Sequence, residues 1–176
     1  TYDALRAAPV GVHFKAEVSM GHSENLSAFF PCETVDGPPL VVTTPLSGWF
    51  SCAGERGTGI AVAISVCQEL STLSPVLLVM PTGHELGYLG AAKFIDALDH
   101  PVSGVLHLGS CIADKTALDQ DGAMRSVSNL EGAPFSRVCN ALESLNVKPE
   151  QPRNPTSPRE WIGESELWAP FNCPMI

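Results

Sequence analysis

The side chains in this sequence that could do chemistry follow the ends of short apolar runs. They comprise a hydroxyl, two imidazoles, two carboxylates and a guanidinium: Ser47, His84, His107, Glu55, Glu85 and Arg56. A hydroxyl next to an imidazole and a carboxylate can form a nucleophile, base and orienter set. This makes Ser47, His84 and Glu85 the catalytic candidates of a hydrolase. The candidates for substrate binding are Arg56, Glu55, Trp49 and His107.

Each of these residues also has a purely structural interpretation. Glu85 and His84 open an expected helix, whose positive dipole end favours a carboxylate. Ser47 lies in a strand-to-loop turn and lacks the G-x-S-x-G elbow of serine hydrolases. Arg56 can bind a substrate carboxylate in bidentate fashion or form a salt bridge with Glu55 or Glu85. The residue types alone do not separate these interpretations.

A zinc site is a further alternative for the two histidines. His84-Glu85 begins like the H-E-x-x-H zinc motif, but Tyr88 holds the position of the second histidine. A metal ion here would need His84, Glu85 and the distant His107 together. His107 lies inside an apolar run, where a hydrogen-bonded core histidine is the competing interpretation. Trp49 is either a pocket wall or a cover of the core.

The elements that must position these residues follow an alternating pattern. Short unbroken apolar runs fit strands buried on both faces, and the segments between them have helical spacing. The predicted strands are residues 40–44, 76–80 and 102–108, and the predicted helices are 58–70 and 84–98. This order requires right-handed crossovers and a parallel sheet. Since ligands bind beyond the carboxyl ends of such strands, we expect the candidate residues to converge there.

The rest of the chain predicts an edge and a covering region. Residues 10–19 alternate apolar and polar side chains as a half-buried strand does, and residues 24–30 form a second strand, so both are expected as an antiparallel edge. The remaining segments are expected to be a loop, a helix, a proline-rich surface loop and an apolar return to the core: residues 109–132, 134–145, 148–159 and 161–176.

Composition narrows the class of protein. Apolar residues make up 44% and charged residues 16% of the 176 residues, which excludes a disordered chain and fits one α/β domain. The net charge of −9, without a basic stripe, argues against binding nucleic acid or anionic membranes. No apolar run reaches the ~18 residues of a membrane span, and no signal peptide is visible. We therefore expect a soluble protein, with a cytoplasmic location favoured.

Several motifs resemble the zinc exopeptidases of the leucyl aminopeptidase, glutamate carboxypeptidase II and transferrin receptor type. The similar segments are residues 41–47, 52–59, 83–91, 105–109 and 170–176, of which Gly-His-Glu-Leu-Gly at 83–87 is the most specific. The resemblance implies a three-layer α/β/α fold with a mixed, centrally parallel sheet. It also implies a single domain over residues 1–176 that is incomplete at its C-terminus, because the last histidine ligand of the family would lie beyond Ile176.

The metal ligands of that family are mostly replaced here. The family's His-x-Asp pair, bridging Asp, general-base Glu and last Asp fall on Pro45, Ser47, Gly54, His84 and Gly109. Glu85 alone is retained. Because a catalytic zinc ion needs about three protein ligands, we expect no metal and no cofactor.

Two functions therefore stay open. One is an aminopeptidase-like domain that has largely lost its metal site and serves as a binding or scaffold domain. The other is an active peptidase or amidohydrolase with chemistry rebuilt around Ser47, His84, Glu85 and His107. In either case a small molecule or peptide is expected in the crevice at the strand ends. Glu164, Glu166 and Trp168 lie near the family's substrate-facing loop, without an assigned role.

Overall fold

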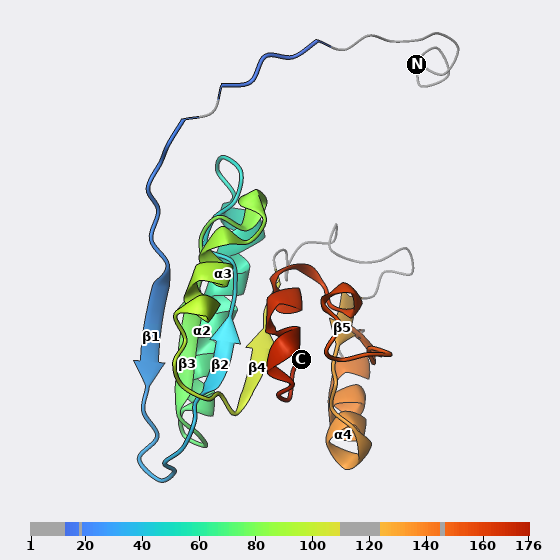
Figure 1. The fold of residues 1–176 in the computed structure, drawn as a ribbon. Coiled ribbons are helices and arrows are strands. Elements are labelled where there is room, and N and C mark those ends of the chain that lie inside the picture. The colour runs from blue at the N-terminus through green and yellow to red at the C-terminus, as the bar shows by residue number, and fades with distance from the viewer. Residues whose placement is uncertain (1–12, 18, 110–123, 145–146) are drawn as a thin grey trace, which may run out of the picture.

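The computed structural model describes residues 13–17, 19–109, 124–144 and 147–176. Its centre is a four-stranded sheet of order β1-β3-β2-β4. The strands are β1 (Leu26–Phe30), β2 (Leu40–Thr43), β3 (Val76–Met80) and β4 (Gly104–His107). β2 is parallel to both β3 and β4, whereas β1 is antiparallel to β3. This arrangement confirms the predicted α/β class with a mixed, centrally parallel sheet (Figure 1).

Helices cover both faces of the sheet. Successive side chains of a strand point to opposite faces, so the fully buried Val41 and Val42 belong to different clusters. Val42 packs with side chains of α2 (Thr58–Leu70). Val41 packs with side chains of α3 (Leu89–Asp96) and the 3₁₀-helix η5 (Gly163–Phe171). The three layers follow from this division.

Most elements near the candidate residues lie close to the predicted bounds, although β4 covers only residues 104–107 of the predicted strand 102–108. β3 and α2 cover the predicted residues, and β2 ends one residue early. The helix expected at residues 84–98 is instead divided into the 3₁₀-helix η2 (His84–Leu86) and α3. Gly87 and Tyr88 separate the two, with left-handed φ values of 75° and 62° that a continuous right-handed helix excludes. The residues before α2 form a π-helix, η1 (Ala53–Gly57), rather than a loop.

The prediction of a strand at residues 10–19 is wrong for the residues that the structure describes. Residues 13–17 and 19 form no strand, and Phe14 is 87% exposed. Residues 10–12 and 18 lie outside the described part of the chain. An alternating pattern marks two faces, but a strand also needs a hydrogen-bonding neighbour. No strand among the described residues pairs with this segment, so β1 alone forms the antiparallel edge.

A second, smaller sheet was not predicted. β5 (Met124–Val127) and β6 (Val147–Glu150) pair in parallel, with α4 (Gly132–Glu143) between them. These strands fall in segments expected to be a loop and a proline-rich irregular stretch. Pro149 is tolerated because a strand of a two-stranded sheet has one edge free of ladder hydrogen bonds. Residues 110–123 of the expected loop and residue 145 of the expected helix lie outside the described part of the chain.

The last segment returns to the core as expected. Trp161, Trp168 and Met175 are buried against the β2, β3 and β4 face of the sheet. The Val105 N–H donates to the Pro174 carbonyl oxygen at 2.8 Å, and Met175 forms a parallel bridge with Val105. A short 3₁₀-helix, η4 (Pro158–Glu160), precedes η5. None of the helices in the described residues is long and apolar enough to cross a membrane.

Gly90 is predicted to tolerate no side chain. A Cβ there would collide with the Thr82 carbonyl oxygen and Asn25 Oδ1, and backbone cannot move aside cheaply. Gly90→Ala should therefore lower the free energy of unfolding by about 2 kcal/mol or more, measured by urea denaturation. The control is Gly57→Ala, where no atom lies within 4 Å and the backbone is helical at φ −59°. Equal effects of the two substitutions would contradict this packing.

Candidate functional site

Arg56 joins the loops that follow β2 and β3. Its side chain is 3% exposed. Nε donates to the Ser47 carbonyl oxygen at 2.7 Å, and Nη2 donates to Glu85 Oε1 at 2.6 Å. Nη2 also lies 3.1 Å from Glu55 Oε1. Four of the predicted site residues therefore meet at the carboxyl ends of the strands, and the salt-bridge interpretation of Arg56 holds for both glutamates.

The local backbone makes room for this guanidinium. The Arg56 N–H donates to the Cys52 carbonyl oxygen at 2.8 Å, which fixes the turn of η1. A Cβ on Gly48 would lie 2.9 Å from Cys52 Sγ and 3.1 Å from Arg56 Nε. The absence of a side chain at Gly48 is therefore what allows Arg56 to pass under the loop towards Glu85.

The Ser47 hydroxyl connects the same two loops. Its Oγ accepts hydrogen bonds from the N–H groups of Gly83 at 2.8 Å and His84 at 3.4 Å. Among the described residues no imidazole forms a hydrogen bond with it. These contacts position the loop after β3, and they are those of a turn residue. A nucleophilic role for Ser47 stays a prediction.

His84 faces a carboxylate on the C-terminal segment. Its Nδ1 lies 3.1 Å from Glu164 Oε1, although the angles do not make this contact a hydrogen bond. Glu164 is fully buried at the start of η5. Burial raises the pKa of its carboxyl, and the neighbouring His84 and Arg56 partly oppose that rise. The His84 and Tyr88 rings pack with centroids 5.0 Å apart.

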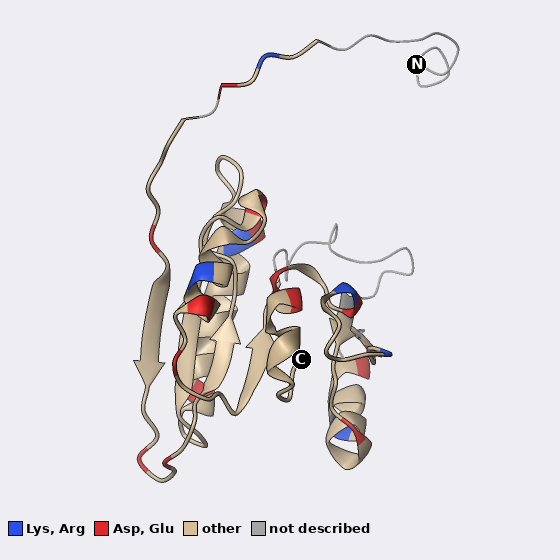
Figure 2. Cartoon of the chain, in the orientation of Figure 1, with Lys and Arg blue, Asp and Glu red and all other residues tan. Residues whose placement is uncertain are grey.

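Glu164 is the site residue to which sequence analysis assigned no role. The available signal was its place in the apolar stretch between Trp161 and Trp168, where a carboxylate is costly unless it has a partner. Figure 2 shows acidic residues at the end of η5 that lies on the same side as the arrowheads of β2 and β4. Only the packing of η5 against the sheet brings this carboxylate to His84.

The two remaining candidates have contrasting environments. Burial, and then the nearby charge of His84, lower the pKa of His107 to about 4, so the imidazole is neutral near pH 7. The core interpretation of His107 therefore fits its surroundings. Trp49 is 62% exposed, so it is no cover of the core.

The buried polar atoms without a hydrogen-bond partner among the described residues all belong to this site. They are Arg56 Nη1, His84 Nδ1, His107 Nδ1, Glu164 Oε1 and Glu164 Oε2. Buried polar groups in folded proteins are nearly always paired. Their concentration at the predicted rim identifies it as the candidate functional site.

The residues present do not fit a pair of zinc ions. Proline and glycine at positions 45, 54 and 109 supply no side-chain ligand. Glu85, the one position at which the resemblance implies a metal ligand, already accepts a hydrogen bond from Arg56, which places a fixed positive charge beside that carboxylate. Within the described ranges no three His, Cys, Asp or Glu side chains are grouped to hold a metal ion.

Comparison with known proteins gives the fold. No protein-family model and no curated protein matches the chain. Similar solved structures include BSAP, a zinc aminopeptidase from Bacillus subtilis, with a TM-score of 0.56 and 15% identity over 86% of this chain and 38% of that chain. LapA aminopeptidase from Legionella pneumophila has a TM-score of 0.52 and 12% identity over 87% and 47%. LapB from the same organism gives 0.53 and 12% over 86% and 47%.

The fold is therefore that of the zinc aminopeptidases. The chain spans less than half the length of these similar proteins. At such low identity the likeness extends to the fold alone. The chemistry of this chain has to be argued from its own side chains.

Removing the buried cation should be costly. Arg56→Met leaves Glu85 and Glu55 without their shared partner, so we expect the free energy of unfolding to fall by about 3 kcal/mol in urea denaturation. Glu55→Gln is the matched control, because Glu55 is 39% exposed and its pairing is screened by solvent. That control should change stability by about 1 kcal/mol or less. If Arg56→Met is as mild as the control, Arg56 does not hold the two loops together.

The neutral, buried His107 predicts loss of stability in acid. Its pKa is about 4 in the folded chain against 6.5 for an ordinary histidine, so the unfolded chain binds the proton first. The stabilisation is complete above pH 6.5 and is lost as the pH falls towards 4, by about 3 kcal/mol. Glu164, whose pKa is raised, contributes in the opposite direction, so wild type must be compared with a variant.

The variant for this comparison is His107→Gln, which has no group titrating in that interval. Urea denaturation at several pH values between 7 and 4 should show a shallower decline in stability for the variant than for wild type. Parallel declines would show that His107 titrates near its ordinary pKa.

Proposed function

We propose that this chain is a divergent relative of the zinc exopeptidases that serves as a binding or scaffold domain rather than as a metallopeptidase. The observation that carries the proposal is the 2.6 Å ion pair between the buried Arg56 guanidinium and the partly buried Glu85 carboxylate. It supplies one positive charge, covalently attached to the chain, to the carboxylate at the retained ligand position. A permanent guanidinium and a metal ion compete for the same oxygen atoms.

The chemistry of this substitution opposes metal-dependent hydrolysis. In two-metal enzymes the ions polarise the scissile carbonyl and lower the pKa of a bound water. A guanidinium keeps its proton at any physiological pH, so it cannot generate hydroxide from water. It can bind and orient carbonyl or carboxylate groups. The proposed function therefore keeps ligand binding at the rim, with a small molecule or peptide as its occupant.

We further propose that residues 1–176 form one zinc-exopeptidase-like domain that is part of a longer chain. The two hydrophobic clusters share the same central sheet, and the C-terminal segment packs on β4, which supports a single folded unit. The similar structures, of which this chain covers 38% and 47%, support the presence of further chain in the complete protein.

A metal-free hydrolase is the second candidate. Its support is the contact between the His84 imidazole and the buried Glu164 carboxylate, since a buried acid next to a histidine is how many hydrolases orient a general base. His107 and Glu85 lie beside this pair in the same site. The Ser47 hydroxyl is occupied by two backbone donors, and water is therefore the better nucleophile for this mechanism.

Metal content and hydrolysis separate the candidates. The purified protein should contain far less than one zinc ion per chain by elemental analysis, and it should not hydrolyse leucine p-nitroanilide or simple amides. His84→Ala should then change local stability only. Two zinc ions per chain, together with hydrolysis that a chelator abolishes, would refute the binding-domain proposal. Hydrolysis that survives a chelator but disappears in His84→Ala would establish the second candidate.

A further inference from the structure

The loop between β2 and η1 presents two aromatic side chains to solvent. Trp49 is 62% exposed and Phe50 is 98% exposed. Phe50 has a φ of 54°, in the left-handed region that bulky residues rarely adopt. The loop extends beyond the end of α2 (Figure 1). Among the described residues, the Phe50 ring has one aromatic contact, with Trp49 at a centroid distance of 6.5 Å. This contact leaves the ring exposed and does not explain the strained backbone.

This aromatic loop adjoins the Arg56 site. Ser47, two residues before Trp49, binds Arg56 Nε through its carbonyl oxygen. Leu86, directly after Glu85, is 65% exposed and lies on the loop that Arg56 holds from the other side. Exposed apolar side chains scattered singly are ordinary, but here three of them lie on the two segments that Arg56 joins, which offers apolar surface to a partner.

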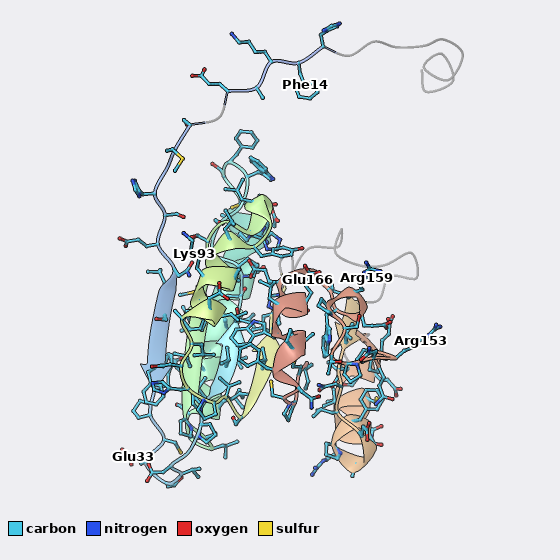
Figure 3. The ribbon with its side chains drawn as sticks, viewed as in Figure 1. Phe14, Glu33, Lys93, Arg153, Arg159 and Glu166 are labelled. Atoms are coloured by element: carbon cyan, nitrogen blue, oxygen red, sulfur yellow. The ribbon has the colours of Figure 1, made fainter. Side chains whose placement is uncertain are left out.

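The same rim carries an excess of negative charge. Glu55 and Glu85 share one guanidinium, that of Arg56. Glu164 and Glu166 come from η5, and Figure 3 shows Glu166 at the end of that helix nearest the rim. Burial raises the pKa of Tyr88, and the negative charges of Glu166, Glu164 and Glu85 raise it further.

Two side chains at the rim also carry buried atoms that have no hydrogen-bond partner among the described residues. They are both carboxylate oxygens of the fully buried Glu164 and Nη1 of Arg56. Three partly exposed glutamates, Glu55, Glu85 and Glu166, against one guanidinium attract cationic side chains, whereas the chain as a whole, at −9, repels a second copy of itself and anionic lipids. Cations also bind the faces of exposed aromatic rings.

We propose that this acidic and aromatic rim, formed by Trp49, Phe50, Leu86, Glu55, Glu85 and Glu166, binds an internal segment of a partner protein in which lysine or arginine flanks an apolar side chain. The apolar side chain packs on Trp49 and Phe50, and the basic side chains face Glu55 and Glu166. This inference deepens the proposed binding function and rests on it.

The test measures binding through the fluorescence of Trp49. Trp161 and Trp168 are buried, at 6% and 1% exposure, so a change in solvent-exposed tryptophan fluorescence on binding reports Trp49. The probe is a peptide of alternating lysine and leucine, acetylated at its N-terminus and amidated at its C-terminus. Blocked ends remove the amine that an aminopeptidase would recognise. The matched peptide has glutamate in place of lysine.

The expected result is a blue shift with the lysine peptide that weakens with added salt, and none with the glutamate peptide. Phe50→Gly should weaken binding about ten-fold. It should leave stability unchanged or raise it, because glycine adopts a φ of 54° without strain. Leu73→Ser is the control: Leu73 is 70% exposed in the turn after α2, at the other end of that helix, and binding should not change.

Other outcomes overturn the inference. Equal binding of both peptides, or full binding by Phe50→Gly, removes the role assigned to charge and to the aromatic loop. Self-association that Phe50→Gly abolishes assigns the rim to a second copy, and binding to phosphatidylserine vesicles assigns it to a membrane. Zinc content and hydrolysis measured on the same preparation keep the two proposals apart: hydrolysis defeats the binding-domain proposal, whereas failure of the peptide in an inactive protein defeats only this inference.

Discussion

The organisation of the rim depends on one buried guanidinium. Arg56 reaches Ser47 on the loop after β2 and Glu85 on the loop after β3, so that two segments 38 residues apart in the chain are held by the same side chain. Its charge is compensated by carboxylates, since a buried cation without partners would be prohibitively costly. Gly48 leaves room for this group, η1 carries it, and η2 carries its partner Glu85.

The same interaction supports the proposal that this chain keeps a fold like that of the zinc aminopeptidases without a dizinc site. In a metal site, cations draw carboxylates from several strands to one point and thereby stabilise the loops. Here a guanidinium contributes part of that attraction, and the Ser47 hydroxyl fixes the backbone at Gly83 and His84. The sheet, its crossovers and the helices on both faces do not require the metal, because their stability comes from the buried valines of β2 and β3.

Sequence patterns were informative where an element's identity depends on its own residues. The aliphatic runs of β2 and β3 and the helical spacing of α2 are local signals, and the structure has these elements where they were expected. The patterns failed where the formation of a strand depends on a hydrogen-bonding neighbour elsewhere in the chain. Residues 13–17 alternate like a strand, but no strand in the described part of the chain pairs with them, whereas β5 and β6 show little pattern and form a sheet because they pair with each other. The break at Tyr88 depends on a backbone conformation that its residue type does not announce.

The sequence by itself determined the α/β class, the convergence of Ser47, Arg56, Glu85 and His84 at the strand ends, and the absence of side-chain ligands at positions 45, 54 and 109. These follow from strand order and from the chemistry of single residues. Only the tertiary structure decided that Arg56 pairs with both glutamates, that Glu164 reaches His84, and that Phe50 is exposed. Each of these depends on distances between segments far apart in the chain, which are set by packing and not by local sequence.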